Sequence, residues 1–110
     1  MIFEVVVLPT AERDLARILT WLSQRSASGA VTWLNRWDEV VQTLSESPER
    51  CGLAPESDNH PLPIRQVIFR TRKGNPYRAI FAIKDRKVFV IHVRGMGQQT
   101  IDVTGLPAVD

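Results

Sequence analysis

The chain has 110 residues, of which 44% are hydrophobic and 24% are charged. This is the length of one ordinary domain, spanning residues 1–110, and the composition excludes a disordered or collagen-like chain. Apolar runs such as Val5–Leu8 and Val88–Ile91 are far shorter than the roughly 18–20 residues that cross a bilayer, and no secretory signal is visible. The single cysteine, Cys51, cannot form an internal disulfide. We therefore expect a cytoplasmic protein that does not associate with membranes.

Basic residues gather in the last half of the sequence. The net charge is only +2, but the segment from Arg65 to Arg94 holds nine Lys or Arg, with Asp85 as its one acidic residue. Residues 1–64 hold five Lys or Arg against nine Asp or Glu. The basic block predicts a positive surface that attracts phosphates or an acidic peptide. The alternative is a hydrated strand face on which the charges protect exposed positions.

The amino-terminal region predicts a strand followed by a helix. Phe3–Leu8 is rich in β-branched residues and is ended by Pro9, which is typical of a strand. Thr10 is then a candidate helix N-cap, and acidic residues follow it in the first turn. Helical spacing predicts a first helix from Ala11 to about Gln24. Its apolar stripe consists of Ala11, Leu15, Ile18, Leu19 and Leu22.

A second amphipathic helix follows a short turn rich in Ser and Gly. It should run from Ala30 to about Glu46, because Pro48 cannot continue it. Trp33 and Trp37 lie one turn apart on this helix. They could form a platform for a nucleobase, but core packing is the favoured interpretation. Two helices joined by so short a turn form an antiparallel hairpin.

Residues 47–63 contain four prolines and show no periodicity, so they predict a connecting loop. Three β-rich runs follow, at Ile64–Arg70, Tyr77–Lys84 and Lys87–Arg94. The connection at Asp85-Arg86 is short enough for a tight hairpin, although it lacks the usual glycine. Beyond residue 94 the signal is weak, and Gln99–Val103 is a candidate edge strand.

The element order is therefore β-α-α-β-β-β and the fold class is α+β. An N-terminal strand and a helical hairpin precede the last three strands, and the hairpin packs on one face of a small antiparallel β-sheet. The N-terminal strand should pair with one of the later strands. We expect the opposite face of the sheet to be available to a partner.

The tight turn fixes which residues of the last two strands oppose each other. A Lys84–Lys87 pair predicts that Tyr77 opposes Arg94, Ala79 opposes His92, Phe81 opposes Val90 and Ile83 opposes Val88. Side chains alternate between faces along a strand, so Tyr77, His92 and Arg94 would share one face. Arg78 would lie on the other. A shift of one residue in this register would exchange the faces.

These strands supply the candidate site residues. Arg65, Arg78, Arg94 and Tyr77 are candidates for binding an anion or a target, because arginine offers a fork of donors and tyrosine can stack or donate. Arg78, His92 and Arg94 are the candidate catalytic residues. RNA cleavage by acid–base chemistry needs a base, an acid and cations around the transition state, and His92 is the one evident acid–base group among these residues.

Each candidate also has a structural interpretation. A lone histidine within a strand, such as His92, is more often structural. Arg65 and Arg78 could be exposed on the strand or could pair with a loop carboxylate such as Glu56 or Asp58.

No metal site or cofactor is predicted. His60, His92 and Cys51 lack metal-ligand spacing, and there is no glycine-rich phosphate loop. Cys51 has no base near it in the sequence and is interpreted as an inert thiol.

The ordered set of motifs resembles the ParE/RelE superfamily of bacterial type II toxins, also known as plasmid stabilization proteins. The resemblance covers most of residues 3–94. It rests on Val7–Leu15, Ala30–Leu34, Leu44–Arg50, Pro63–Arg65, Tyr77–Phe81 and Val88–Arg94.

The resemblance implies the same helical hairpin on a sheet and a toxin neutralised by a cognate antitoxin. It also implies a homodimer or a toxin–antitoxin hetero-oligomer. ParE-like members are associated with inhibition of DNA gyrase, whereas RelE-like members cleave messenger RNA on the ribosome. Arg65, Arg78 and Arg94 match the basic strand positions of the family, and His92 lies beside the last of them.

The sequence departs from the RelE-like pattern after Arg94, where no Tyr, His, Lys or Arg follows. This favours a ParE-like toxin that binds its target over a ribonuclease. The alternatives are a RelE-like ribosome-dependent endoribonuclease and an inactive relative that still binds its antitoxin.

Overall fold

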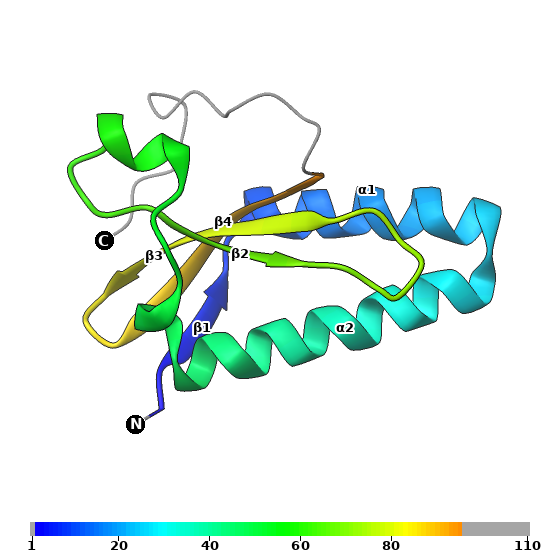
Figure 1. Cartoon of the computed structure of the whole chain (residues 1–110), viewed down its shortest axis with the longest axis horizontal. Helices are drawn as coiled ribbons and strands as arrows, with labels where there is room; N and C mark the ends of the chain where they lie inside the picture. Colours follow the sequence, from blue (N-terminus) through cyan, green and yellow to red (C-terminus); the bar gives the residue numbers. More distant parts are fainter. Residues whose placement is uncertain (1, 96–110) are drawn as a thin grey trace.

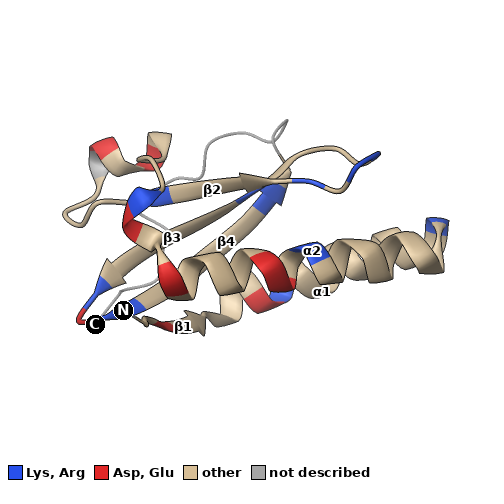
Figure 2. Cartoon of the chain, turned by 60° about the horizontal axis from the view of Figure 1, so that its bottom comes forward, with Lys and Arg blue, Asp and Glu red and all other residues tan. Residues whose placement is uncertain are grey.

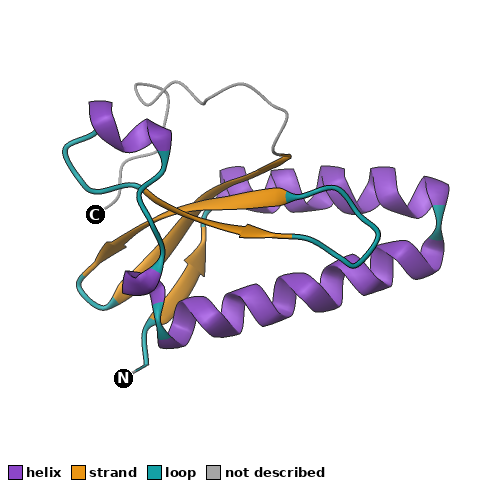
Figure 3. Cartoon of the chain, viewed as in Figure 1, coloured by secondary structure: helices purple, strands orange, loops and turns teal. Residues whose placement is uncertain are grey.

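The computed structural model describes residues 2–95 and contains four strands, two long helices and two short 3-10 helices in this part of the chain (Figures 1 and 3). Their bounds are β1 Glu4–Val7, α1 Pro9–Arg25, α2 Ala27–Glu46, η1 Pro48–Arg50, η2 Pro55–Asn59, β2 Arg65–Phe69, β3 Tyr77–Lys84 and β4 Lys87–Gly95. The predicted element order is confirmed, and the candidate strand Gln99–Val103 lies outside the described residues. None of the described helices is long and apolar enough to cross a membrane.

The four strands form one sheet in the order β1-β4-β3-β2. The pairs β2–β3 and β3–β4 are antiparallel, as predicted, whereas β1 pairs parallel to β4. The α+β class is confirmed, and the parallel strand makes the sheet mixed. A parallel partner is available to β1 because the helical hairpin between them provides a long crossover connection.

Pro9 both ends β1 and starts α1. Leu8 is the N-cap and Pro9 occupies the first helical position, where its missing N–H costs nothing. The prediction that Thr10 caps the helix is therefore wrong. Its hydroxyl instead donates to the carbonyl of Ile91 at 2.6 Å, and Asp14 one turn later accepts from the Val93 N–H at 3.0 Å. The first turns of α1 thus provide hydrogen-bond partners for backbone groups of β4 in the part of the strand that extends beyond β1.

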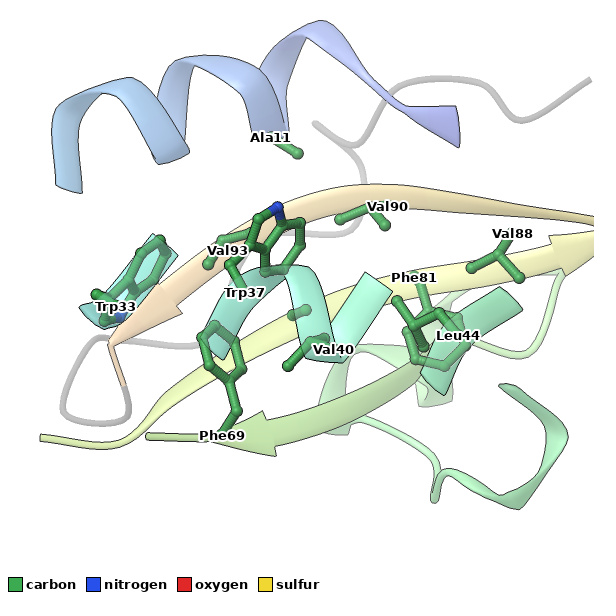
Figure 4. Close-up of a cluster of buried hydrophobic side chains, with 11 residues drawn as sticks. Ala11, Trp33, Trp37, Val40, Leu44, Phe69, Phe81, Val88, Val90 and Val93 are labelled. Carbon is green, nitrogen blue, oxygen red and sulfur yellow. The ribbon is translucent and has the colours of Figure 1, made fainter. Parts of the chain in front are cut away.

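The larger core lies between the helices and the sheet (Figure 4). Trp33 and Trp37 are only 3% and 5% exposed, so the core interpretation of both tryptophans is confirmed. Their rings are nearly parallel with centroids 6.4 Å apart, and Phe69 from β2 packs against both. The apolar stripes of α1 and α2 therefore cover a single face of the sheet.

A second apolar cluster covers the other face of the sheet. It joins side chains of β3 and β4 to residues of the proline-rich segment, and its buried members are Ala54, Ile64, Ile80, Ala82, Phe89 and Ile91. The expectation that this face is open to a partner is wrong. The segment after α2 returns across the sheet because its apolar residues can bury themselves there, at a gain of about 25 cal/mol for each Å² removed from water.

The β3–β4 hairpin holds the predicted register near its turn and loses it further on. Lys84 pairs with Lys87 and Phe81 with Val90, but the register shifts between Ile80 and Phe81. Ile91 becomes the extra residue of a β-bulge.

Beyond this bulge, Arg94 pairs with Arg78 and His92 with Ile80. The predicted pairs of Tyr77 with Arg94 and of Ala79 with His92 are therefore wrong. The placement of His92 and Arg94 on the face of Tyr77 is wrong for the same reason.

Candidate functional site

Arg78 lies on the sheet face opposite the helices and is only 5% exposed. Its Nη1 and Nη2 donate to Oε1 and Oε2 of Glu56 at 2.8 and 2.7 Å. Nη1 also donates to Oε1 of Gln66 at 3.2 Å. The fork of the guanidinium is thus taken by a loop carboxylate, which confirms the structural interpretation of Arg78. Its candidate roles in anion binding and catalysis stay predictions, and the geometry does not favour them.

Arg65, at the start of β2, has its guanidinium turned toward the loop backbone. Nη1 donates to the carbonyl oxygen of Cys51 at 2.6 Å and lies 3.5 Å from that of Glu49. Burial raises the pKa of the neighbouring Cys51 thiol, and the Arg65 charge lowers it by a smaller amount. This arginine therefore holds the loop to the sheet.

The basic block does not form one continuous surface. Figure 2 shows its Lys and Arg residues at both ends of the sheet. Arg70, Arg72 and Lys73 lie at the tip between β2 and β3, whereas Lys84, Arg86 and Lys87 lie at the β3–β4 turn. The two groups are separated by the length of β3, which is about 25 Å at 3.3 Å per residue. The expectation of a single cationic surface formed by the whole block is wrong.

A cleft of about 510 Å³ is lined by both Tyr77 and Arg94. It lies beside α1, at the end of the β3–β4 hairpin opposite the turn. The helix contributes Arg17 and Trp21, and Asp14 also lies in the wall. Ile18 of α1 and Val93 and Gly95 of β4 complete the lining. The cleft combines two cations with two aromatic rings, a combination suited to binding an acidic segment that carries an apolar anchor.

Tyr77 and Arg94, which both line this cleft, are partly held by the protein interior. Tyr77 packs edge-on against Trp33, with ring centroids 5.4 Å apart, and burial raises the pKa of its phenol. Nε of Arg94 is buried without a hydrogen-bond partner in the described part of the chain. A buried unsatisfied donor costs about 1–3 kcal/mol.

His92 lies on the other side of Asp14 from the cleft. Its Nδ1 donates to Oδ2 of Asp14 at 2.8 Å, and Oδ1 of the same carboxylate accepts from Arg17. His92 is therefore part of a bonded cluster between β4 and α1. Its structural role is confirmed, while its catalytic role stays a prediction.

The sequence analysis missed Asp14, Arg17 and Trp21. One signal for Asp14 was present, because it falls on the apolar stripe of the first helix, between Ala11 and Leu15. A carboxylate on a buried face needs partners, and Asp14 is 4% exposed and has three. Arg17 and Trp21 lie off the stripe, and no sequence signal distinguishes them from ordinary surface residues.

A helical hairpin packed on one face of a four-stranded sheet is the architecture expected of a ParE/RelE-superfamily toxin. The family model described as "ParE toxin of type II toxin-antitoxin system, parDE" matches residues 5–100. That is most of the chain, and the chain therefore belongs to the ParE toxin family.

A search of solved structures supports the fold. The chain is similar to one from "Chromosomal ParDE TA system from P. aeruginosa", with a TM-score of 0.63 and 17% sequence identity. The match covers 86% of this chain and 96% of the other. A comparison with curated proteins found no match. Membership in the family implies an antitoxin partner.

Proposed function

We propose that the protein is a ParE-like toxin that acts in the cytoplasm by binding and inhibiting a nucleic-acid-processing enzyme such as DNA gyrase. A cognate antitoxin neutralises it. The observation that carries this proposal is the cleft beside α1, where Arg17 and Arg94 flank Trp21 and Tyr77. An acidic segment with an aromatic or aliphatic anchor complements this lining in both charge and apolarity.

The arrangement of the candidate catalytic residues supports binding over cleavage. Arg78 faces away from the helices and is bound to Glu56. It would have to break a buried ion pair before it could stabilise a phosphorane-like transition state, and such breaks cost about 3–5 kcal/mol. The cleft lining contains no histidine.

The test begins with the purified full chain and DNA gyrase in a supercoiling and DNA-cleavage assay. We expect inhibition or trapped cleavage complexes that disappear when the antitoxin encoded beside the gene is added. Arg94→Ala and Arg17→Ala should weaken antitoxin binding at least tenfold and reduce its salt dependence. Arg72→Ala, on the exposed β2–β3 tip, is the matched control and should change neither.

Two outcomes would contradict the proposal. If gyrase is unaffected at any excess of the protein, gyrase is not the target. If Arg94→Ala and Arg17→Ala bind antitoxin with unchanged affinity and salt slope, the cleft is not the binding site.

One observation favours the alternative of a ribosome-dependent endoribonuclease. His92 is oriented by Asp14, as an acid–base histidine often is. If this alternative holds, induction should produce new RNA 5′ ends within translated codons, and His92→Gln should abolish them. Normal growth on induction without antitoxin would instead indicate an inactive antitoxin-binding relative.

A further inference from the structure

A second, shallower pocket lies on α1 next to the cleft. It encloses about 250 Å³ and is lined by Thr10, Arg13, Asp14, Arg17 and His92. Asp14 and Arg17 line both hollows, so they form the wall between them. Thr10 donates its hydroxyl to the Ile91 carbonyl, which ties this end of α1 to β4.

The Asp14 carboxylate is already engaged by the protein. Oδ1 accepts from Arg17, and Oδ2 accepts from both His92 Nδ1 and the Val93 N–H at 2.8 and 3.0 Å. Its three bonds offset its charge and leave it little capacity to accept from a ligand. Asp14 therefore acts as a positioning residue that fixes the imidazole ring. Nδ1 is held against α1, and Nε2 on the far side of the ring is directed away from Asp14.

The two arginines in this pocket, Arg13 and Arg17, have guanidinium N–H groups that are not engaged by the described part of the protein. Arg13 and Arg17 are one turn apart on an exposed side of α1, and among residues 2–95 Arg13 makes no ion pair or side-chain hydrogen bond. Arg17 uses one guanidinium nitrogen for Asp14, and its side chain is 73% exposed. Like charges at this spacing destabilise a helix by about 0.2–0.5 kcal/mol, and an anion bound between them removes that repulsion.

We propose that this pocket is a binding site for a phosphate group. Arg13 and Arg17 donate to two of its oxygens, and His92 Nε2 makes the third contact. With Nδ1 donating to Asp14, Nε2 donates to a phosphate oxygen in the imidazolium form. In the neutral form it accepts only from a protonated phosphate oxygen, which free phosphate offers and a phosphodiester does not. Donors that approach from a helix and from a strand suit a tetrahedral oxyanion better than a planar carboxylate, which one guanidinium alone can satisfy. Two sources share this chemistry, namely free phosphate and the phosphodiester backbone of a nucleic acid.

The experiment measures binding to the purified full chain by calorimetry, with inorganic phosphate in one arm and a short single-stranded oligonucleotide without terminal phosphates in the other. The key variants are Arg13→Ala and His92→Asn. The asparagine amide replaces Nδ1 as the donor to Asp14 but has no counterpart of Nε2, so it separates binding from folding. Both variants should keep the wild-type thermal midpoint within a few degrees and lose about tenfold in affinity. Arg72→Ala is the control and should bind as the wild type does.

Each arm has a defined meaning. If both variants bind more weakly than the wild type in the phosphate arm only, the site is assigned to free phosphate. If both variants bind the oligonucleotide more weakly, the site is assigned to a phosphodiester, whatever the result in the phosphate arm. The proposal is overturned if Arg13→Ala and His92→Asn leave binding unchanged in both arms, or if neither probe binds the wild-type chain. Because neither arm uses gyrase or antitoxin, the result is independent of the function proposed above.

Discussion

The buried ion pair between Arg78 and Glu56 gives the sharpest test of how this fold is held together. Replacing Arg78 with Met keeps most of the side-chain length but leaves the Glu56 carboxylate, whose side chain is 0% exposed, without its bidentate partner. Removing one member of a buried pair costs about 3–5 kcal/mol, because the remaining buried charge loses the bidentate partner that offsets its desolvation. That is a large share of the roughly 5–15 kcal/mol that stabilises a typical domain.

Urea unfolding followed by tryptophan fluorescence measures this loss. With a slope of about 2 kcal/mol per M urea, the Arg78→Met variant should lower the midpoint by about 2 M. The double variant Arg78→Met with Glu56→Leu removes both charges and should be more stable than the single variant, with a coupling energy of about 2 kcal/mol or more. Arg72→Met makes the same chemical change on the exposed hairpin tip and should move the midpoint very little.

The reasoning is refuted if Arg78→Met costs less than about 1 kcal/mol. It is also refuted if the double variant is no more stable than the single one. Either result would mean that Glu56 does not depend on Arg78 to remain buried and that the pair does not fix the proline-rich loop on the sheet.

Three further predictions follow from the turn, the thiol and the phenol. Asp85 and Arg86 both have positive φ, at 52° and 63°, so the Asn-Gly replacement should raise stability by about 1 kcal/mol in the same urea assay, and an unchanged midpoint would contradict this. Burial raises the pKa of the Cys51 thiol, so iodoacetamide should alkylate it more slowly at pH 7 in the folded chain than in urea, and equal rates would refute this. Burial also raises the pKa of Tyr77, the one tyrosine of the chain, so its absorbance at 295 nm should titrate above pH 10. The folded state then holds this proton more tightly than the unfolded state, so the stability that Tyr77 contributes should fall as the pH rises past about 10. A midpoint of the absorbance titration at or below about pH 10 would contradict the burial of Tyr77.

The sequence predicted the elements and the larger core because both depend on local periodicity. The apolar positions of α1 and α2 recur every three or four residues, which placed Trp33 and Trp37 on a buried face before any contact was known. The bounds of β3 match the prediction at both ends, and the start of β4 follows from the same two-residue turn. The family motifs have the same local character, and the family that they indicated was confirmed by a family model matching residues 5–100.

The candidate site was predicted less well, because one inserted residue changes every partner beyond it. The bulge at Ile91 paired Arg94 with Arg78 in place of Tyr77, and no residue type in β4 marks that position. Tyr77 and Arg94 still line one cleft, but the second cation and the second ring come from α1. Arg65 and Arg78 were predicted to bind a ligand, and the loop before β2 engages both.

The amino-acid sequence alone specified which segments form helices or strands and which face of each is buried, because both depend on neighbouring residues. Only the tertiary structure decided the partners of the charged groups. Arg78 meets a carboxylate 22 residues away and His92 meets one 78 residues away. Such contacts depend on strand register and on the path of a returning loop. The loop's path is set by the burial of distant apolar groups, so no local pattern of charges encodes these pairs.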